Sequence, residues 1–103
     1  MPKLPLCVIL EYLSDETREK VLEELACSIN RDIKKDVARY ENTPGNILSK
    51  LANDDTRIIR EAVACNLNTP IESLSELARD KCSFVRDSAI KNLQKRNELR
   101  RNK

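Results

Sequence analysis

Apolar residues recur at spacings of three and four over most of the chain, in short stripes separated by polar breaks. Leu48 and Leu51 lie in one such stripe, and Ile59 and Val63 continue the pattern beyond a polar break at residues 54–56. Spacings of three and four place side chains on one face of an α-helix, whereas a strand alternates with a period of two. The pattern therefore predicts two short amphipathic helices joined by a tight turn.

This two-helix pattern occurs more than once, with a constant displacement of 26 residues. Residues 42–44 and 68–70 both read Asn-Thr-Pro, and a fainter copy upstream carries Thr17 in the place of Thr43. A fixed period of this length is typical of stacked units that bury their apolar faces against each other. The predicted units lie near residues 17–42, 43–68 and 69–97.

The two ends of the chain differ from these units. Apolar residues at helical spacing, Leu6, Ile9, Leu10 and Leu13, predict a capping helix over residues 4–14 that covers the first unit. Residues 98–103 form a basic tail at the other end. We therefore predict one all-α domain over residues 1–103, built as a short α-solenoid of about three two-helix repeats.

Helix starts are marked by Thr-Pro pairs. Thr43 and Thr69 are predicted N-caps, with Pro44 and Pro70 at the first helical position, where a missing N–H costs nothing. Glu72 follows Thr69 at the spacing of a capping box. Asparagines near the unit ends are predicted to tie loops and caps to backbone groups: Asn42, Asn66, Asn68 and Asn92.

Composition supports the helical prediction and argues against a polycation and against a membrane span. Only 3% of the residues are aromatic and there is one glycine, so Leu, Ile, Val and Ala must fill the core, which favours helices. Charged residues make up 35% of the chain, but the net charge is only +2, as in a mixed surface rather than a polycation. No apolar run approaches the length of a membrane span.

The four cysteines are Cys7, Cys27, Cys65 and Cys82, and the chain has no Cys-x-x-Cys pair and no histidine. Free thiols of this kind indicate a reducing compartment, so we expect a cytoplasmic protein without a metal or cofactor. A site of four thiolates, assembled from distant units, is the alternative.

The motif Asn-Thr-Pro, then Leu-x-x-Leu-Ala-x-Asp from Leu48 and again from Leu74, then Ile-Arg or Val-Arg, resembles the bacterial leucine-rich repeat variant. This family is related in shape to HEAT and armadillo repeats. The resemblance implies a right-handed superhelix of short paired helices and no single activity. One architecture of the family carries an iron-sulfur cluster in a cysteine-rich N-terminal segment, but that segment contains only Cys7 here, so the cluster is not expected.

Two pairs of charged residues recur at the 26-residue period: Asp54 with Arg60, and Asp80 with Arg86. In the stacks that this chain resembles, such pairs bond between a turn and a neighbouring helix, which makes a structural ladder the expected role. A ladder of binding residues is the alternative.

The second helix of each unit carries basic residues at spacings of three and four, which stacking aligns into a basic ridge. Its members are Arg31, Lys34, Lys35, Arg39, Arg57 and Lys91. Glu61 and Asp87 interrupt it. We expect a protein-protein interaction module or adaptor that binds through this ridge. Nucleic-acid binding through the ridge and the basic tail is the alternative, and a merely solvated face is the third interpretation.

Catalytic motifs are absent from the sequence, so we do not expect an enzyme. There is no histidine and no glycine-rich phosphate loop, and adjacent carboxylates such as Asp54 and Asp55 are typical of capping and solvation. Ile58 and Phe84 share one position in successive units. They are interpreted either as packing between units or as an exposed apolar patch for a partner.

Overall fold

The computed structural model of the chain describes residues 6–101, without the side chains of Cys7 and Arg101. These residues form α-helices and no strand, which confirms the predicted all-α class. The helices are α1 (Leu6–Glu11), α2 (Asp15–Ala26), α3 (Arg31–Arg39), α4 (Gly45–Leu51), α5 (Arg57–Cys65), α6 (Ile71–Leu77) and α7 (Ser83–Arg101).

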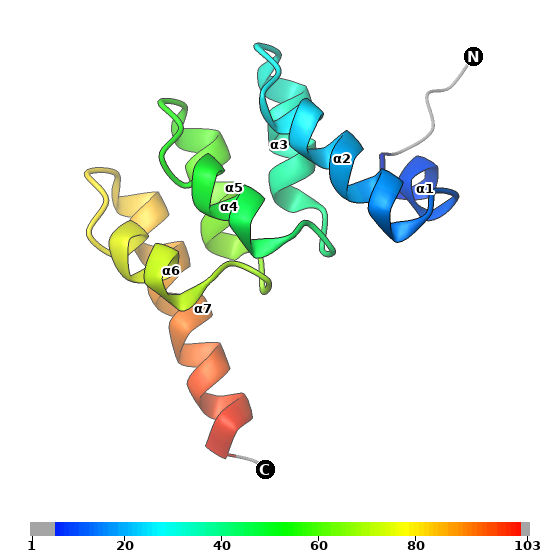
Figure 1. Cartoon of the computed structure of the whole chain (residues 1–103). Coiled ribbons are helices and arrows are strands. Elements are labelled where there is room, and N and C mark those ends of the chain that lie inside the picture. Colours follow the sequence, from blue (N-terminus) through cyan, green and yellow to red (C-terminus); the bar gives the residue numbers. More distant parts are fainter. Residues whose placement is uncertain (1–5, 102–103) are drawn as a thin grey trace.

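The helices from α2 onward are arranged as three helix pairs. Figure 1 shows α2, α4 and α6 following one another on one side of the molecule, with α3, α5 and α7 behind them. Each first helix packs against its own second helix, and α3, α5 and α7 also pack against each other in sequence order. We refer to α2–α3, α4–α5 and α6–α7 as the first, second and third helix pairs.

The outer ends differ in part from the expectation. The predicted capping helix over residues 4–14 corresponds to α1, while residues 4 and 5 lie outside the described part of the chain. The first pair begins earlier than Thr17, because the Ser14 hydroxyl accepts a hydrogen bond from the Thr17 backbone N–H at 3.3 Å and caps α2. At the other end, α7 continues through Arg101, so the described part of the predicted tail is helical.

The predicted threonine caps are wrong. The N-caps of α4 and α6 are Pro44 and Pro70, and neither helix start has a side-chain capping bond, so Glu72 completes no capping box. The Thr43 hydroxyl instead donates to the Val37 carbonyl at 2.6 Å, and the same bond recurs one pair later. Both hydroxyls are fully buried, and each satisfies a carbonyl at the end of the preceding helix, so neither is free to cap the next.

A single apolar core runs through all three pairs and reaches Leu10 of α1. Leu22, Leu48 and Leu74 occupy the same position in successive pairs and are fully buried. The apolar residues that recur at spacings of three and four in the sequence therefore face the core. Among residues 6–101, no helix combines the length and the apolar character needed to cross a membrane.

Three of the four predicted asparagines, Asn66, Asn68 and Asn92, bond to backbone carbonyls, and these bonds join successive pairs. Asn42 is exposed, and no such bond is observed for it among the described residues. The Asn66 side-chain amide donates to the carbonyls of Ala38 and Tyr40, each at 2.9 Å, and Asn92 makes the same two bonds to Ala64 and Asn66. Asn68 donates to the Thr43 carbonyl, also across the pairs. These bonds satisfy carbonyls at helix ends that would otherwise be buried without donors.

Tyr40 occupies the asparagine position in the first pair, and its buried hydroxyl has no hydrogen-bond partner. Since a buried hydroxyl without a partner is destabilising, we expect Tyr40→Phe to keep or raise the free energy of unfolding, by up to about 1 kcal/mol. Urea denaturation followed by circular dichroism measures the change. Tyr12→Phe is the matched control, because Tyr12 is 87% exposed and should show no change. A loss of stability in Tyr40→Phe alone would contradict the prediction.

Candidate functional site

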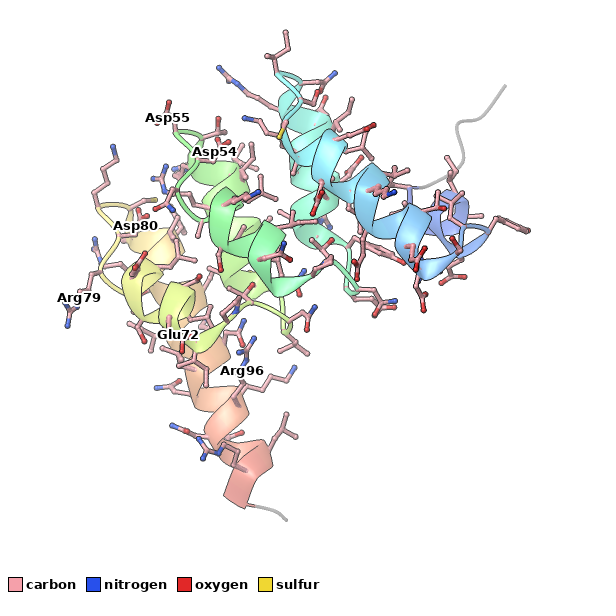
Figure 2. The ribbon with its side chains drawn as sticks, in the orientation of Figure 1. Asp54, Asp55, Glu72, Arg79, Asp80 and Arg96 are labelled. Carbon is pink, nitrogen blue, oxygen red and sulfur yellow. The ribbon has the colours of Figure 1, made fainter. Side chains whose placement is uncertain are left out.

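The ion pairs of the predicted ladder join successive helix pairs. Lys34 of α3 forms an ion pair with Asp54 in the turn of the second pair, with 2.7 Å between Nζ and Oδ2. One period later, Arg60 of α5 contacts Asp80 in the turn of the third pair, through Nε to Oδ2 at 2.8 Å and Nη2 to Oδ1 at 3.2 Å. Figure 2 shows Asp54 and Asp80 in these successive turns.

Within one pair, the predicted partners meet through a backbone atom. Arg60 Nη1 donates to the Asp54 carbonyl at 2.9 Å, and Arg86 Nη1 donates to the Asp80 carbonyl at 2.7 Å. The carboxylate of each aspartate also accepts the backbone N–H two residues later in its own turn, which holds the turn in shape. The arginine therefore braces its own turn and binds the next one.

Burial and charge pairing shift the pKa values of these groups in opposite directions, and pairing with its hydrogen bonds is the stronger effect. Arg60 is 7% exposed, and its hydrogen bond to Asp80 raises the guanidinium pKa. Burial alone would raise the pKa of Asp80, but the hydrogen bonds from Arg60 and from the Cys82 backbone N–H outweigh it and lower the pKa. Asp54 has a lowered pKa for the same reasons, with Lys34 as its cation. These carboxylates are therefore charged and structural at neutral pH.

One residue of the predicted basic ridge, Lys34, instead forms an ion pair of the ladder. Lys34 occupies the position of Arg60 in the preceding pair, and its side chain is largely covered in the ion pair with Asp54. The other predicted ridge residues lie on the outer face of the second helices: Arg31, Arg39, Arg57 and Lys91 are exposed, and Lys35 is half-buried. The position of Lys35 is taken by Glu61 and Asp87 in the following pairs, so the cations do not form one continuous strip.

A hollow of about 400 Å³ lies on this outer face between α3 and α5. Lys35 and Arg39 border it on α3, and the α5 side supplies Ile58, Glu61 and Ala62. Cys65 and Asn66 complete the lining. The hollow thus combines an apolar surface with two cations and one carboxylate, the mixture expected where a partner side chain is bound and oriented. Ala62 and Cys65 were not among the predicted site residues, although they follow Ile58 at spacings of four and then three, which place them on the same helix face.

The two apolar residues that precede the core positions are exposed. Ile58 is 51% exposed and Phe84 is 62% exposed, so packing between units does not account for them. The Arg57 guanidinium carbon lies 5.8 Å from the centroid of the Phe84 ring, within cation-π range. Ile58 at the hollow and Phe84 on α7 are therefore two exposed apolar side chains, and Arg57 of α5 lies over the Phe84 ring.

The structure describes the side chains of three cysteines, and that of Cys7 lies outside the described part. Cys27 and Cys65 are exposed free thiols, and Cys82 is half-buried. The backbone N–H of Val85 at the start of α7, together with the Phe84 N–H and Arg57, lowers the pKa of the Cys82 thiol. Over residues 6–101, no group of three or more histidine, cysteine, aspartate or glutamate side chains is placed to hold a metal ion.

Comparisons with known proteins identify no relative of the chain. No family model, no curated protein and no solved structure matches the chain. Function must therefore be inferred from the surfaces themselves.

Proposed function

We propose that the chain is a short right-handed α-solenoid of the leucine-rich repeat variant or HEAT-like type, with a period of 26 residues. Bonds that recur at this period support the proposal. The Asn66 and Asn92 amides, the Thr43 and Thr69 hydroxyls, and the cations Lys34 and Arg60 make equivalent contacts in successive pairs. Stacked repeats of this kind provide extended surfaces for binding.

We further propose that the protein is a non-catalytic binding module for another protein, acting in the cytoplasm. The hollow between α3 and α5 carries this proposal, because it places Lys35 and Arg39 beside exposed Ile58. Such a site fits an extended acidic segment that inserts one apolar side chain while its carboxylates meet the cations. Exposed thiols, here Cys27 and Cys65, fit a reducing compartment.

Reversing the charges beside the hollow is expected to abolish partner capture. The full chain, immobilised and exposed to a lysate of the native host, should retain a protein that the double variant Lys35→Glu, Arg39→Glu loses. Affinity measured with the purified partner should fall by about tenfold or more. The matched control is Lys20→Glu, Lys50→Glu, because both lysines are exposed on the first helices, away from the hollow.

Three outcomes separate the interpretations. Loss of the partner in the first variant but not in the control supports the proposed site. Equal retention by both variants contradicts it. Tight binding of a labelled DNA duplex or RNA strand, with affinity that falls steeply as salt rises, would instead indicate a nucleic-acid binder.

A further inference from the structure

Arg86 occupies the ladder position in the third helix pair, one period after Arg60 and two after Lys34. Lys34 and Arg60 each bind a carboxylate in the turn of the pair that follows. No pair follows the third within residues 6–101, and over that range Arg86 Nε and Nη2 have no hydrogen-bond acceptor. Arg60 binds Asp80 through Nε and Nη2, and the same two nitrogens of Arg86 are therefore free over that range.

The Arg86 guanidinium is anchored by one of the two backbone bonds that anchor Arg60 within its own pair. Arg60 Nη1 donates to the carbonyl six residues earlier, and Arg86 Nη1 makes the same bond to Asp80. In Arg60, this arrangement directs Nε and Nη2 toward the next turn, where both bind one carboxylate. An arginine fixed through one nitrogen loses little further freedom when a carboxylate binds the remaining N–H groups in bidentate fashion.

The surface around Arg86 has the composition of an interface between pairs. Ala38 and Ala64 are fully buried where the next pair covers them, and Ile90 at the same position is 40% exposed. The Ser49 hydroxyl lies 2.9 Å from the Ser73 hydroxyl of the next pair, whereas Ser75, equivalent to Ser49, is exposed. The outer face of the third pair thus keeps the arginine and the serine of the second pair, and it presents the larger Ile90 where the earlier pairs have a buried alanine.

We propose that this outer face of α6–α7 binds an acidic helical hairpin of a partner protein, whose turn carboxylate pairs with Arg86 and whose helices cover Ile90. A carboxylate is the expected partner of Arg86, because the two equivalent cations, Lys34 and Arg60, both bind an aspartate in a turn between helices. This surface is separate from the hollow between α3 and α5 and does not depend on it.

A second copy of the chain does not supply this partner. In the first pair, Ser28 takes the position of Asp54 and provides no carboxylate. The outer side of that pair is also occupied by α1, whose Leu10 is fully buried and accepts a hydrogen bond from Arg18 at 2.9 Å. Two third pairs brought face to face would place one Arg86 against another, which is unfavourable.

The test attaches to the intact chain a helical hairpin with a carboxylate in its turn, called the acidic copy below after this aspartate. The probe is a copy of residues 69–94, which contains the turn aspartate that binds Arg60, joined behind Lys103 by a Gly/Ser linker. From Arg86 to the end of α7 the helix extends about 22 Å, and a linker of about 20 residues spans about 25 Å. Tethering holds the probe at about millimolar effective concentration. In the matched control, the aspartate of the copy is replaced by asparagine.

Two measurements report docking of the probe. We expect the Arg86 Nε–H resonance in nuclear magnetic resonance spectra to shift, and the helical content to rise, with the acidic copy. Docking should be about 10 to 100 times weaker with the asparagine copy, because a charge-assisted pair is lost. Arg86→Gln should weaken docking similarly, and Arg86→Lys, which retains charge without the bidentate fork, should give an intermediate value.

Other outcomes overturn the proposal. An acidic copy that leaves the Arg86 resonance and the helical content unchanged shows that the face does not accept such a hairpin. Equal docking of the acidic and asparagine copies shows that Arg86 does not select a carboxylate. Self-association of the unmodified chain in analytical ultracentrifugation, lost in Arg86→Gln, would identify a second copy as the occupant instead.

Discussion

Replacing Asp80 with alanine is expected to lower the free energy of unfolding by about 3 to 5 kcal/mol. The change leaves the Arg60 guanidinium, which is 7% exposed, without its carboxylate, and it also removes the acceptor of the Cys82 backbone N–H. An uncompensated buried charge is far more destabilising than the loss of an exposed ion pair. Urea denaturation at neutral pH measures the effect.

The control for Asp80 is Asp55→Ala, because Asp55 is exposed in the preceding turn (Figure 2) and should change stability by less than about 0.5 kcal/mol. Acid supplies an independent check. The pKa values of Asp54 and Asp80 are lowered by folding, so their contribution is present above the unfolded pKa of about 3.9 and is lost as pH falls through the lower folded values. Asp80→Asn should lose less stability over that range than the parent chain. Parallel pH profiles would show that Asp80 contributes no such linkage.

Replacing Leu77 with alanine is expected to lower the free energy of unfolding by about 2 to 5 kcal/mol. Leu77 is 2% exposed, at the end of α6 where the third pair meets the core. The substitution removes buried apolar surface and leaves a cavity that neighbouring side chains only partly fill. Urea denaturation and the midpoint of thermal unfolding both measure it.

Leu99→Ala is the matched control for the core prediction. Leu99 lies near the end of α7 and is largely exposed, so the same chemical change should cost less than about 1 kcal/mol. Leu51 occupies the position of Leu77 one pair earlier and is also buried, so Leu51→Ala should behave like Leu77→Ala. Equal losses at Leu77 and Leu99 would mean that the stripe does not face a packed core.

The two proposed surfaces would make the chain an adaptor. The hollow beside Lys35 and Arg39 lies between α3 and α5, whereas Arg86 and Ile90 lie on the outer face of the last pair. One partner at each surface could bind at the same time, because the surfaces share no residue. Variants at Lys35 and at Arg86 separate the two contacts experimentally.

Local pattern was sufficient for the helices and for their buried faces. Spacings of three and four identified Leu51 and Leu77 as core residues, because a helix repeats every 3.6 residues and one face must be covered. The sequence also indicated that Asn66 and Asn92 bond to backbone groups, but not that these groups belong to the preceding pair, nor that Asn92 lies within α7.

Contacts between pairs were not predictable from local pattern. Thr43 had the sequence context of a cap, but the Val37 carbonyl of the preceding helix took its hydroxyl. Lys34 had the spacing of an outward ridge residue, but Asp54 lies close enough in space to bind it. In both cases, the deciding partner belongs to another element, and its distance follows from how the helices pack.

Spacing and composition along the chain were enough to predict the all-α class and the residues that fill the core. Which charges are buried in ion pairs became visible only in the packed helices. Arg60 and Arg86 occupy equivalent positions in successive helix pairs. Arg60 is buried against Asp80, whereas Arg86 retains free N–H groups over the described residues. The physical reason is that a charge is neutralised by what lies beside it in space, and that depends on whether another helix pair follows.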